Sequence, residues 1–344
     1  MNTKIFKITS QNIDTDAIKC CADIIKSGGL VAFPTETVYG LGADATDKNA
    51  AKKIYAAKGR PSDNPLIIHI ADPKDAEGYA YTSELYYKLA EAFMPGPLTV
   101  ILSKKETIPA EVTGGLDSVA VRCPSHPVAR ELISMSGVPI AAPSANISGS
   151  PSPTSAHHVI KDMDGKIESI IDGDDCEIGL ESTIVKLDGS KAILLRPGAI
   201  TADALGCVCE QVEISSAVTN ALKENERPLS PGMKYRHYAP KSPLVLLDGS
   251  NEDVLAFLIK EQQEKNCIVL CYDEETAYLK KDNTIAIGSS DDLATQAKRL
   301  FSALRQADTM NGEIIYAHLP STDGLGLALY NRMIRAAAHT VMKV

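Results

Sequence analysis

The chain has 344 residues, which is more than one hydrophobic core usually serves, so two domains are expected. Hydrophobic residues make up 44% of the chain and charged residues 23%, as in ordinary globular proteins. The formal net charge of −9 argues against a broad basic surface for nucleic acid or an anionic membrane, and it leaves room only for a local basic cleft.

The first ten residues contain no apolar core of signal-peptide length, and no apolar stretch reaches the roughly 18 residues needed to span a bilayer. We therefore expect a cytoplasmic protein without a membrane span. None of the eight cysteines forms a Cys-x-x-Cys pair, which argues against a zinc ribbon or a redox dithiol. Small buried thiols are the expected role of these residues.

The first half of the chain alternates helical and strand-like patterns. Residues 14–29 have apolar positions at helical spacing and end at two glycines that suit a helix cap. This alternation predicts an α/β domain whose sheet is covered on both faces. Further helices are expected at 48–58 and 126–137, and short buried strands at 30–33, 65–70, 98–102, 118–123 and 139–143, with strand content continuing to residue 198.

Residues 221–243 are polar, contain four prolines and have no usable period, so they are expected to form a linker. Beyond them, four strand-like segments alternate with helices that begin near Glu252, Asp291 and Leu325. This pattern predicts a second, smaller α/β unit. The predicted boundaries are 1–212 for the first domain, 213–242 for the linker and 243–344 for the last domain.

Lys58 and Arg60 follow the predicted helix at 48–58 and precede a turn that contains Pro61 and Pro65. Taken alone, they are best explained as cations that favour the macrodipole at a helix C-terminus. However, the prolines stiffen the turn, and a fixed pair of positive charges before a buried strand suits an anion. Loops at strand ends are also where α/β folds bind ligands.

A second candidate is the run of small polar side chains after the strand at 139–143. Ser144, Asn146, Ser148 and Ser152 offer hydroxyl and amide groups with little bulk. The alternative is a plain serine-rich surface loop. A near-continuous run of hydrogen-bonding side chains directly after a buried strand favours binding of a phosphate or a ribose.

Gly40 and Gly42 imitate a dinucleotide-binding fingerprint, which requires glycines immediately after a strand. The segment PTETVY separates them from the preceding predicted strand, so we reject that match. The hydroxyl groups of Thr35 and Thr37, on either side of Glu36, are instead placed to bind a small polar substrate. The sequence has no Walker motif, so any nucleotide would be bound by another route.

Three further features are weak when taken singly, because surface arginines are common. Arg122 ends a predicted strand and is a candidate clamp for a carboxylate. Ser182 and Thr183 lie at the start of another strand. Arg196 places a cation at a strand end before a turn.

Taken in order, seven segments resemble the YrdC/Sua5 family: FPTETVYGLG, KGRPSDNPL, PGPLTVIL, VAVRCPSHP, APSANISGSPSPT, GLESTIV and LRPGAI. SPGMKYRHYAP, followed by a small α/β domain that contains STDGLGLALYNRMIRAA, is similar to the two-domain Sua5 form. The resemblance implies a YrdC-like twisted mixed sheet with helices, plus a smaller Rossmann-like Sua5 C-terminal domain.

The resemblance also implies an enzyme, the nucleotidyltransferase L-threonylcarbamoyladenylate synthase. Such an enzyme joins L-threonine, bicarbonate and ATP and releases pyrophosphate. Its product supplies downstream tRNA-modifying threonylcarbamoyl transferase proteins, which make t6A at position 37 of tRNAs reading ANN codons. The implied catalytic residues are Lys58, Arg60, Ser144 and Asn146; the implied threonine-binding residues are Thr35, His69, Arg122, Ser144 and Ser182; and the implied ATP-binding residues are Lys58, Arg60, Asn64, Asn146, Ser152, Arg196, Tyr235 and His237.

This chemistry requires no protein nucleophile, because a carbamate oxygen formed from threonine and bicarbonate attacks the α-phosphorus of ATP. The sequence agrees, since it offers no convincing Ser/His/Asp or Cys/His set. Lys58 and Arg60 would hold the triphosphate, with Ser144 and Asn146 facing it across the cleft. Mg²⁺ is expected to arrive with ATP and not to be held by a protein metal site, because no cluster of acidic ligands occurs.

The predicted linker has a role of its own. Residues 231–240 place Lys, Arg, His and two Tyr side chains between two prolines, and a pure tether would need neither aromatic nor cationic groups. We expect this segment to fold over the cleft as a lid that excludes water from the adenylate. Cutting the chain at Gly206 should then abolish synthesis or increase hydrolysis of the intermediate.

Three other interpretations stay open. An RNA-binding module is disfavoured by the acidic net charge and by the lack of interleaved aromatic and basic residues, so direct tRNA contact is not expected to dominate. A YrdC-like carbamoyl transferase of hydrogenase maturation would carry zinc-finger cysteine pairs, which this sequence lacks. A plain ATP-binding regulatory protein would not use the threonine pocket. Dependence of pyrophosphate release on both threonine and bicarbonate separates these possibilities.

Overall fold

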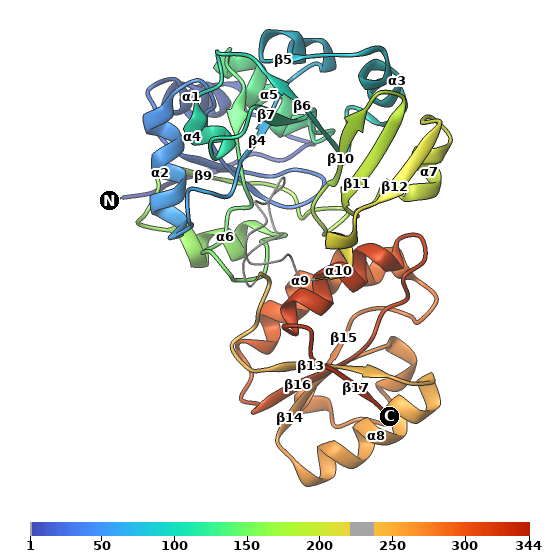
Figure 1. Cartoon of the computed structure of the whole chain (residues 1–344). Helices are drawn as coiled ribbons and strands as arrows, with labels where there is room; N and C mark the ends of the chain where they lie inside the picture. Colours follow the sequence, from blue (N-terminus) through green and yellow to red (C-terminus); the bar gives the residue numbers. More distant parts are fainter. Residues whose placement is uncertain (1, 221–236) are drawn as a thin grey trace. The chain divides into compact units, whose positions relative to one another are not determined.

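A computed structural model describes residues 2–220 and 237–344, which form two compact units (Figure 1). Among the described residues, the first unit comprises 2–148, 152–177 and 181–220. The second comprises 149–151, 178–180 and 237–344. No helix within these ranges has both the length and the apolar character that a bilayer crossing requires.

In residues 2–220 the strands form one mixed sheet, as expected from the sequence. β4 pairs with β7 in parallel, whereas β6 pairs with β7 and β2 pairs with β3 in antiparallel fashion. The spatial order is β1 (Lys4–Lys7), β9 (Ser169–Asp172), β2 (Val31–Phe33), β3 (Gly40–Asp44), β8 (Ile140–Ala141), β4 (Ile67–His69), β7 (Ser118–Arg122), β6 (Leu98–Lys104), β10 (Thr183–Asp188), β11 (Lys191–Arg196) and β12 (Gln211–Ile214), with β5 (Ala80–Tyr81) beside β6.

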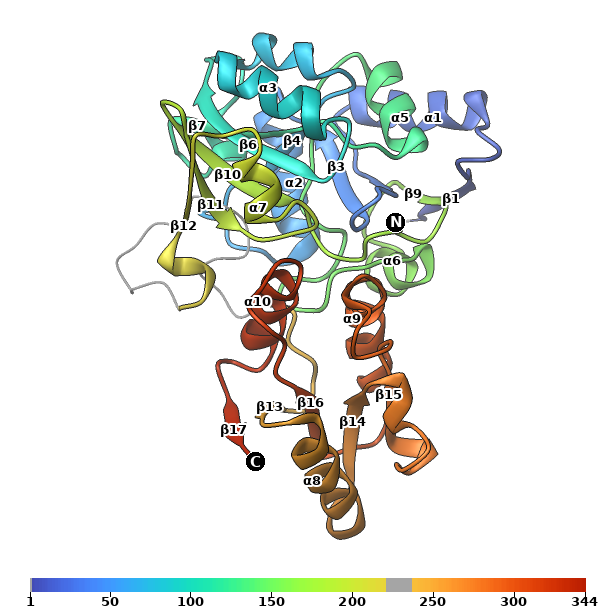
Figure 2. The ribbon, with the colours of Figure 1, turned by 90° about the vertical axis from the view of Figure 1, so that its right-hand side faces the viewer.

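Helices flank this sheet, and α1 and α5, which contribute to one of its apolar clusters, lie side by side (Figures 1 and 2). Ile18, Ile25 and Leu132 from these helices are fully buried in that core together with Phe33 of β2. The helices of the first unit are α1 (Thr15–Lys26), α2 (Lys48–Lys58), α3 (Glu84–Phe93), α4 (Ala110–Thr113), α5 (Pro127–Ser136), α6 (Ala156–Met163) and α7 (Ala202–Gly206), with 3₁₀ turns at Pro73–Gly78 and Ser216–Val218.

α2 ends where the candidate site begins. Asp47 caps its start by accepting a hydrogen bond from the amide of Asn49 at 2.7 Å. Gly59 adopts a left-handed conformation with φ of 61°, which stops the helix at Lys58 because residues with a Cβ rarely adopt that conformation. The helix end therefore holds Lys58 in a fixed position.

β3 was not among the strands predicted from the sequence, where Gly40 and Gly42 were considered only as a dinucleotide-binding fingerprint and rejected. Glycine is uncommon in strands, but here a side chain would not fit. A Cβ at Gly42 would lie 2.7 Å from Cγ2 of Ile140 and 2.8 Å from Cε1 of Phe33. These glycines therefore let β3 lie between β2 and β8.

In residues 237–344 five strands form a parallel sheet in the order β15, β14, β16, β13, β17, which confirms the predicted Rossmann-like domain. Its core contains Leu258, Val269 and Tyr316. The elements are β13 (Leu244–Asp248), α8 (Asn251–Glu264), β14 (Cys267–Cys271), β15 (Thr284–Ala286), α9 (Leu293–Ala307), β16 (Ile314–His318), α10 (Gly326–Ala336) and β17 (Val341–Lys343), with 3₁₀ turns at Asp273–Glu275 and Lys281–Asn283.

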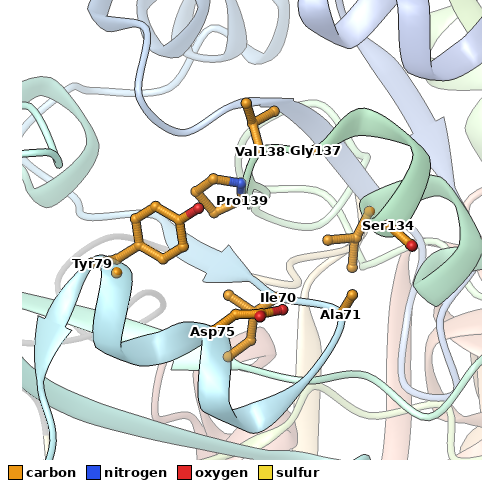
Figure 3. A pocket seen from close by; sticks show the side chains of 10 residues that line it. Ile70, Ala71, Asp75, Tyr79, Ser134, Gly137, Val138 and Pro139 are labelled. Atoms are coloured by element: carbon orange, nitrogen blue, oxygen red, sulfur yellow. The ribbon is translucent and has the colours of Figure 1, made fainter.

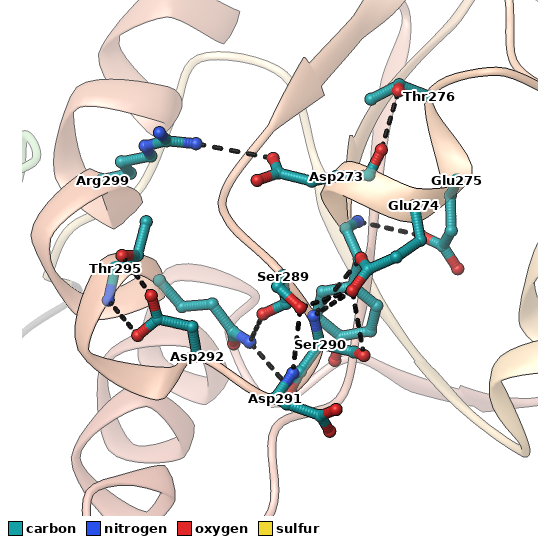
Figure 4. A network of polar contacts seen from close by, with 12 residues as sticks. Asp273, Glu274, Glu275, Thr276, Ser289, Ser290, Asp291, Asp292, Thr295 and Arg299 are labelled. Atoms are coloured by element: carbon teal, nitrogen blue, oxygen red, sulfur yellow. Dashed lines mark hydrogen bonds and ion pairs between the residues drawn. The ribbon is translucent and has the colours of Figure 1, made fainter.

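A polar network joins the segments that follow β14 and β15 in this second unit (Figure 4). Glu274 accepts hydrogen bonds from the Ser289 hydroxyl and the Ser290 amide, and Arg299 lies 3.4 Å from Asp273. Because both partners of the Arg299–Asp273 pair are about half exposed, this ion pair contributes little to stability. Together, these contacts fix loop geometry at the carboxyl edge of the parallel sheet.

All eight cysteines are free thiols, and six of them are buried. Burial was the expected role for the cysteines, and it applies to all except Cys20 and Cys207, which are exposed. Burial raises the pKa of Cys123 to about 12, which keeps this thiol protonated and unreactive at neutral pH.

Candidate active site

Several predicted site residues form one row across the first sheet. Residues directly opposite each other on neighbouring strands point to the same face, so a row places side chains from distant parts of the chain together. The successive partners on β4, β7, β6, β10 and β11 are His69, Arg122, Thr99, Ile184 and Arg196.

At the β11 end of this row, hydrogen bonds join Ser182 to Thr99 and Arg196. The Ser182 hydroxyl lies 2.7 Å from the hydroxyl of Thr99, and Arg196 donates to both the hydroxyl and the carbonyl oxygen of Ser182 at 3.0 Å. A register shift between β10 and β11 brings Arg196, and not Leu195, opposite Ile184. Thr99 was missed by sequence reasoning because a threonine inside a strand has no distinguishing signal.

Arg122, the predicted carboxylate clamp, forms a buried ion pair with Glu36. Arg122 Nη2 lies 2.7 Å from Glu36 Oε1, and the two residues are 4% and 5% exposed. Sequence reasoning noted Glu36 only as the neighbour of Thr35 and Thr37. The pair shows that the loop after β2 reaches the carboxyl end of β7.

His69 is buried beside Arg122. Burial, together with the nearby Arg122 guanidinium, lowers the pKa of His69 to about 3, so the imidazole is neutral at physiological pH. Nδ1 of His69 lies 3.3 Å from the carbonyl oxygen of Ile140, and because a carbonyl can only accept, this nitrogen carries the hydrogen. The strand pairing of β4 with β8 thereby fixes the orientation of the ring.

Lys58 joins the predicted phosphate-binding residues directly. Its ammonium group donates to the carbonyl oxygens of Ser144 and Asn146 at 2.5 and 2.6 Å, and Asn146 Oδ1 is 3.3 Å away. The Ser144 hydroxyl donates to the same Oδ1 at 2.6 Å. Lys58 was expected to face Ser144 and Asn146 across a cleft, whereas the structure brings the three into contact.

Arg60 and Asn64 form the turn after this helix. Arg60 donates to the carbonyl oxygens of Asn64 and Pro65 at 3.1 and 3.0 Å. Asn64 is 1% exposed, yet its side-chain amide has no hydrogen-bond partner among residues 2–220 and 237–344. A buried polar group without a partner is costly, so this amide is available for a ligand.

Ser152 and Thr35 are also buried and already hydrogen-bonded. The Ser152 hydroxyl donates to Glu181 Oε1 at 2.6 Å, so Glu181 is another polar group that sequence reasoning missed. The Thr35 hydroxyl donates to the carbonyl oxygen of Val38 at 2.7 Å and closes a local turn. That turn presents the next residue, Glu36, toward Arg122.

The two remaining predicted ATP contacts lie in the linker. Tyr235 and most of the proposed lid fall outside the described residues. His237 belongs to the second compact unit, where its ring packs on Tyr238 with the ring centres 5.6 Å apart. In the parts of the chain that the structure describes, no three His, Cys, Asp or Glu side chains come together to hold a metal ion.

The first unit also has a separate cavity of about 450 Å³ behind β4 (Figure 3). The ring of Tyr79 and the carboxylate of Asp75 border it, and Val138 and Pro139 line it on the side of α5. None of the predicted site residues lines this cavity. It mixes one carboxylate with apolar walls and indicates no particular ligand.

Comparisons with known proteins match both units. Residues 23–198 match the family model Sua5_yciO_yrdC, described as "Telomere recombination", and residues 200–338 match Sua5_C, described as "Threonylcarbamoyl-AMP synthase, C-terminal domain". The chain is 45% identical to the threonylcarbamoyl-AMP synthase of Pyrococcus abyssi, over 97% of this chain and 98% of that protein. It is 44% identical to the Bacillus subtilis protein of the same name, over 94% and 93% of the two chains.

A shorter relative and a solved structure complete the comparison. The putative threonylcarbamoyl-AMP synthase of Methanocaldococcus jannaschii is 37% identical over 58% of this chain and 95% of its own length. The crystal structure of P. abyssi Sua5 complexed with L-threonine superimposes with a TM-score of 0.91 at 44% identity, covering 99% of this chain and all of that one. In sequence and in fold, the chain therefore belongs to the Sua5/YrdC family.

Proposed function

We propose that the protein is a nucleotidyltransferase that condenses L-threonine, bicarbonate and ATP to threonylcarbamoyl-AMP and pyrophosphate. The main support is the buried row of His69, Arg122 and Arg196 with Thr99 and Ser182, in a chain whose full-length relatives carry the name of this activity. The row supplies cations and hydroxyl groups at one level of the sheet, as a small zwitterionic substrate beside a polyphosphate requires.

The two substrates contact different sets of residues in this proposal. Threonine is bound by Thr35, His69, Arg122, Ser144 and Ser182, with the Arg122 guanidinium on its carboxylate. The triphosphate and ribose of ATP contact a second set, namely Lys58, Arg60, Asn64, Asn146, Ser152 and Arg196, together with Tyr235 and His237 of the linker.

The residues act by positioning and by charge. Negative charge grows on the α-phosphoryl oxygens and on the departing pyrophosphate as the carbamate oxygen attacks, and the cations of Lys58 and Arg60 stabilise it. Lys58 donates to the backbone carbonyls of Ser144 and Asn146, so the loop proposed to bind phosphate is held by the same ammonium group. A neutral His69 adds no charge and serves as a hydrogen-bonding wall of the threonine pocket.

Mg²⁺ is proposed to enter with the phosphates of ATP. The described residues do not fit a protein-held site, because they contain no group of three metal-ligating side chains, and Glu36 and Glu181 are engaged with Arg122 and Ser152.

The product is an activated carbamoyl group, so a transferase must accept it and pass it to tRNA. We propose that downstream tRNA-modifying threonylcarbamoyl transferase proteins are the partners, and that the reaction takes place in the cytoplasm. An acid anhydride between a carbamate and a phosphate hydrolyses readily, which favours handover soon after synthesis.

The test is pyrophosphate release by the full chain with each substrate omitted in turn. We expect release only when L-threonine, bicarbonate and ATP are all present, with a threonylcarbamoyl-AMP product detected by mass spectrometry. Pyrophosphate release that does not depend on threonine would contradict this function. Release that needs threonine but not bicarbonate would indicate an ordinary aminoacyl adenylate instead.

A further inference from the structure

The Glu36–Arg122 pair is incompletely satisfied. Glu36 Oε1 accepts from Arg122 Nη2 at 2.7 Å, but Glu36 Oε2 and Arg122 Nε are buried and have no hydrogen-bond partner within residues 2–220 and 237–344. Both residues are more than nine-tenths buried. Buried ion pairs are normally stabilised by further hydrogen bonds to their remaining atoms. Oε2 of Glu36 therefore needs a hydrogen-bond donor that residues 2–220 and 237–344 do not provide.

The groups around Glu36 do not neutralise this oxygen. His126, before α5, interacts electrostatically with Glu36, but burial lowers the pKa of its imidazole despite the opposing effect of Asp174, so it is neutral at physiological pH. Burial raises the pKa of the Cys176 thiol well above its usual range, with the Glu36 carboxylate adding to the effect, so this group stays uncharged as well. Asp174 and Glu177 are themselves acidic.

The pair matches the charges of an amino acid. A free α-amino acid carries a carboxylate and an ammonium group on one carbon, so it needs a cation and an anion side by side. Arg122 and Glu36 provide these two charges 2.7 Å apart at the carboxyl end of β7, next to the neutral His69.

We propose that Glu36 Oε2 binds the ammonium group of L-threonine and accepts a proton from its nitrogen as the carbamate forms. This inference rests on the proposed function and assigns the residue that selects an amine substrate. Glu36 is thus a catalytic residue that touches the substrate, and Arg122 is its partner on the other end of the zwitterion.

The proton balance of the step is complete. Bicarbonate separates into carbon dioxide and hydroxide, and the hydroxide takes one proton from the ammonium group and leaves as water. The nitrogen lone pair then forms the bond to the carbon of carbon dioxide. As that bond forms, the nitrogen becomes acidic, and its next proton passes to Glu36 Oε2. The products are the carbamate, water and a protonated Glu36, which later releases its proton to solvent.

The experiment compares two ligands by calorimetric titration of the full chain. 3-Hydroxybutyrate has the carboxylate, hydroxyl and methyl groups of threonine but lacks the ammonium group. The wild-type protein should bind threonine about 10- to 100-fold more tightly than 3-hydroxybutyrate, as expected for a charge-assisted contact. In Glu36→Gln this preference should fall to less than about threefold.

The ligand pair separates direct contact from a structural role. If Glu36 only held Arg122 in place, Glu36→Gln would weaken both ligands equally and the preference would remain, which would overturn the inference. Asp174→Asn, which removes a negative charge from the same neighbourhood, should keep the wild-type preference. Wild-type protein that binds threonine no better than 3-hydroxybutyrate would also overturn it, and this result does not depend on whether a variant folds.

A pH series adds a catalytic readout. Glu36→Gln lacks the acceptor for the last nitrogen proton, so this proton must pass to hydroxide and the rate should rise by up to about tenfold per pH unit, whereas the wild-type rate should change far less. Equal slopes would overturn the proton transfer. Failure of the wild-type protein to bind threonine at all would instead refute the proposed function.

Discussion

Lys58 combines two tasks at one atom. The residue is 2% exposed, and its ammonium group donates to two backbone carbonyls of the loop that carries Ser144 and Asn146. A lysine at the end of an isolated helix would lie in solvent, so the burial results from the packing of that loop over the helix end. The same charge is therefore available for loop structure and for phosphate binding.

Lys58→Ala or Arg60→Ala should lower the rate of adenylate formation by about 10²- to 10³-fold, because each removes a positioned cation from the developing phosphate charge. Circular dichroism should show that both variants remain folded. Lys52→Ala, on the same helix but exposed, is the matched control and should retain wild-type pyrophosphate release. Near-normal release from Lys58→Ala would count against its assignment.

His69 makes the stability of the protein dependent on pH. Its pKa is about 3 in the folded chain and about 6.5 when unfolded, so between these values the unfolded state binds one more proton. The free energy of unfolding should therefore fall with decreasing pH by about 1.4 kcal/mol per pH unit from this residue, starting near pH 6.5. Denaturant titrations of wild type and His69→Gln between about pH 4 and pH 7 should show that the variant loses this slope.

His157→Gln, on an exposed position of α6, should keep the wild-type slope. Parallel curves for wild type and His69→Gln would mean that another group causes the acid sensitivity. The comparison is needed because burial also lowers the pKa of His126, which contributes in the same direction.

At the scale of elements, the helix at 48–58 could be predicted from the sequence. The close contacts between neighbouring strands could not. The helix at 48–58 is Lys48–Lys58 in the structure, since alanines, a capping aspartate and a terminal glycine all favour it. β3 was missed because Gly40 and Gly42 carry no strand propensity, and only their contact with Phe33 explains them. The alignment of side chains around Thr99 could not be predicted either, because strand register depends on tertiary pairing.

β3 should tolerate no side chain at its second glycine position. Gly42→Ala should destabilise the protein by about 1–3 kcal/mol, because the added methyl group would overlap Phe33 and Ile140. Chemical denaturation measures this change directly. Gly206→Ala is the control, since a Cβ there meets no atom within 4 Å, and it should be neutral or slightly stabilising. Equal stability of the two variants would refute the steric explanation for glycine in β3.

At the scale of the whole molecule, each unit contains apolar clusters of its own. The clusters around Phe33 and Ile184 belong to the first unit, and the cluster around Val269 belongs to the second. A relative matches 58% of this chain over 95% of its own length.

A fragment of residues 1–220 should unfold cooperatively on heating and should retain threonine binding, because its cores and the row from His69 to Arg196 are complete within it. It should form little adenylate, since it lacks Tyr235 and His237. Scanning calorimetry with and without threonine checks the first expectation, and pyrophosphate release checks the second. A fragment with full synthase activity would remove the proposed role of the linker.

The position of the row along β10 and β11 also indicates where a peptide can be inserted into the chain. Ile184 and Arg196 pair in the row, whereas the tip of the same hairpin, Asp188–Lys191, is four residues further along β10, or about 13 Å. Gly189 at that tip has open space around it. A reporter peptide inserted at this tip should leave substrate binding undisturbed. The β10–β11 hairpin is therefore a suitable site for a tag that detects binding of the enzyme to other proteins.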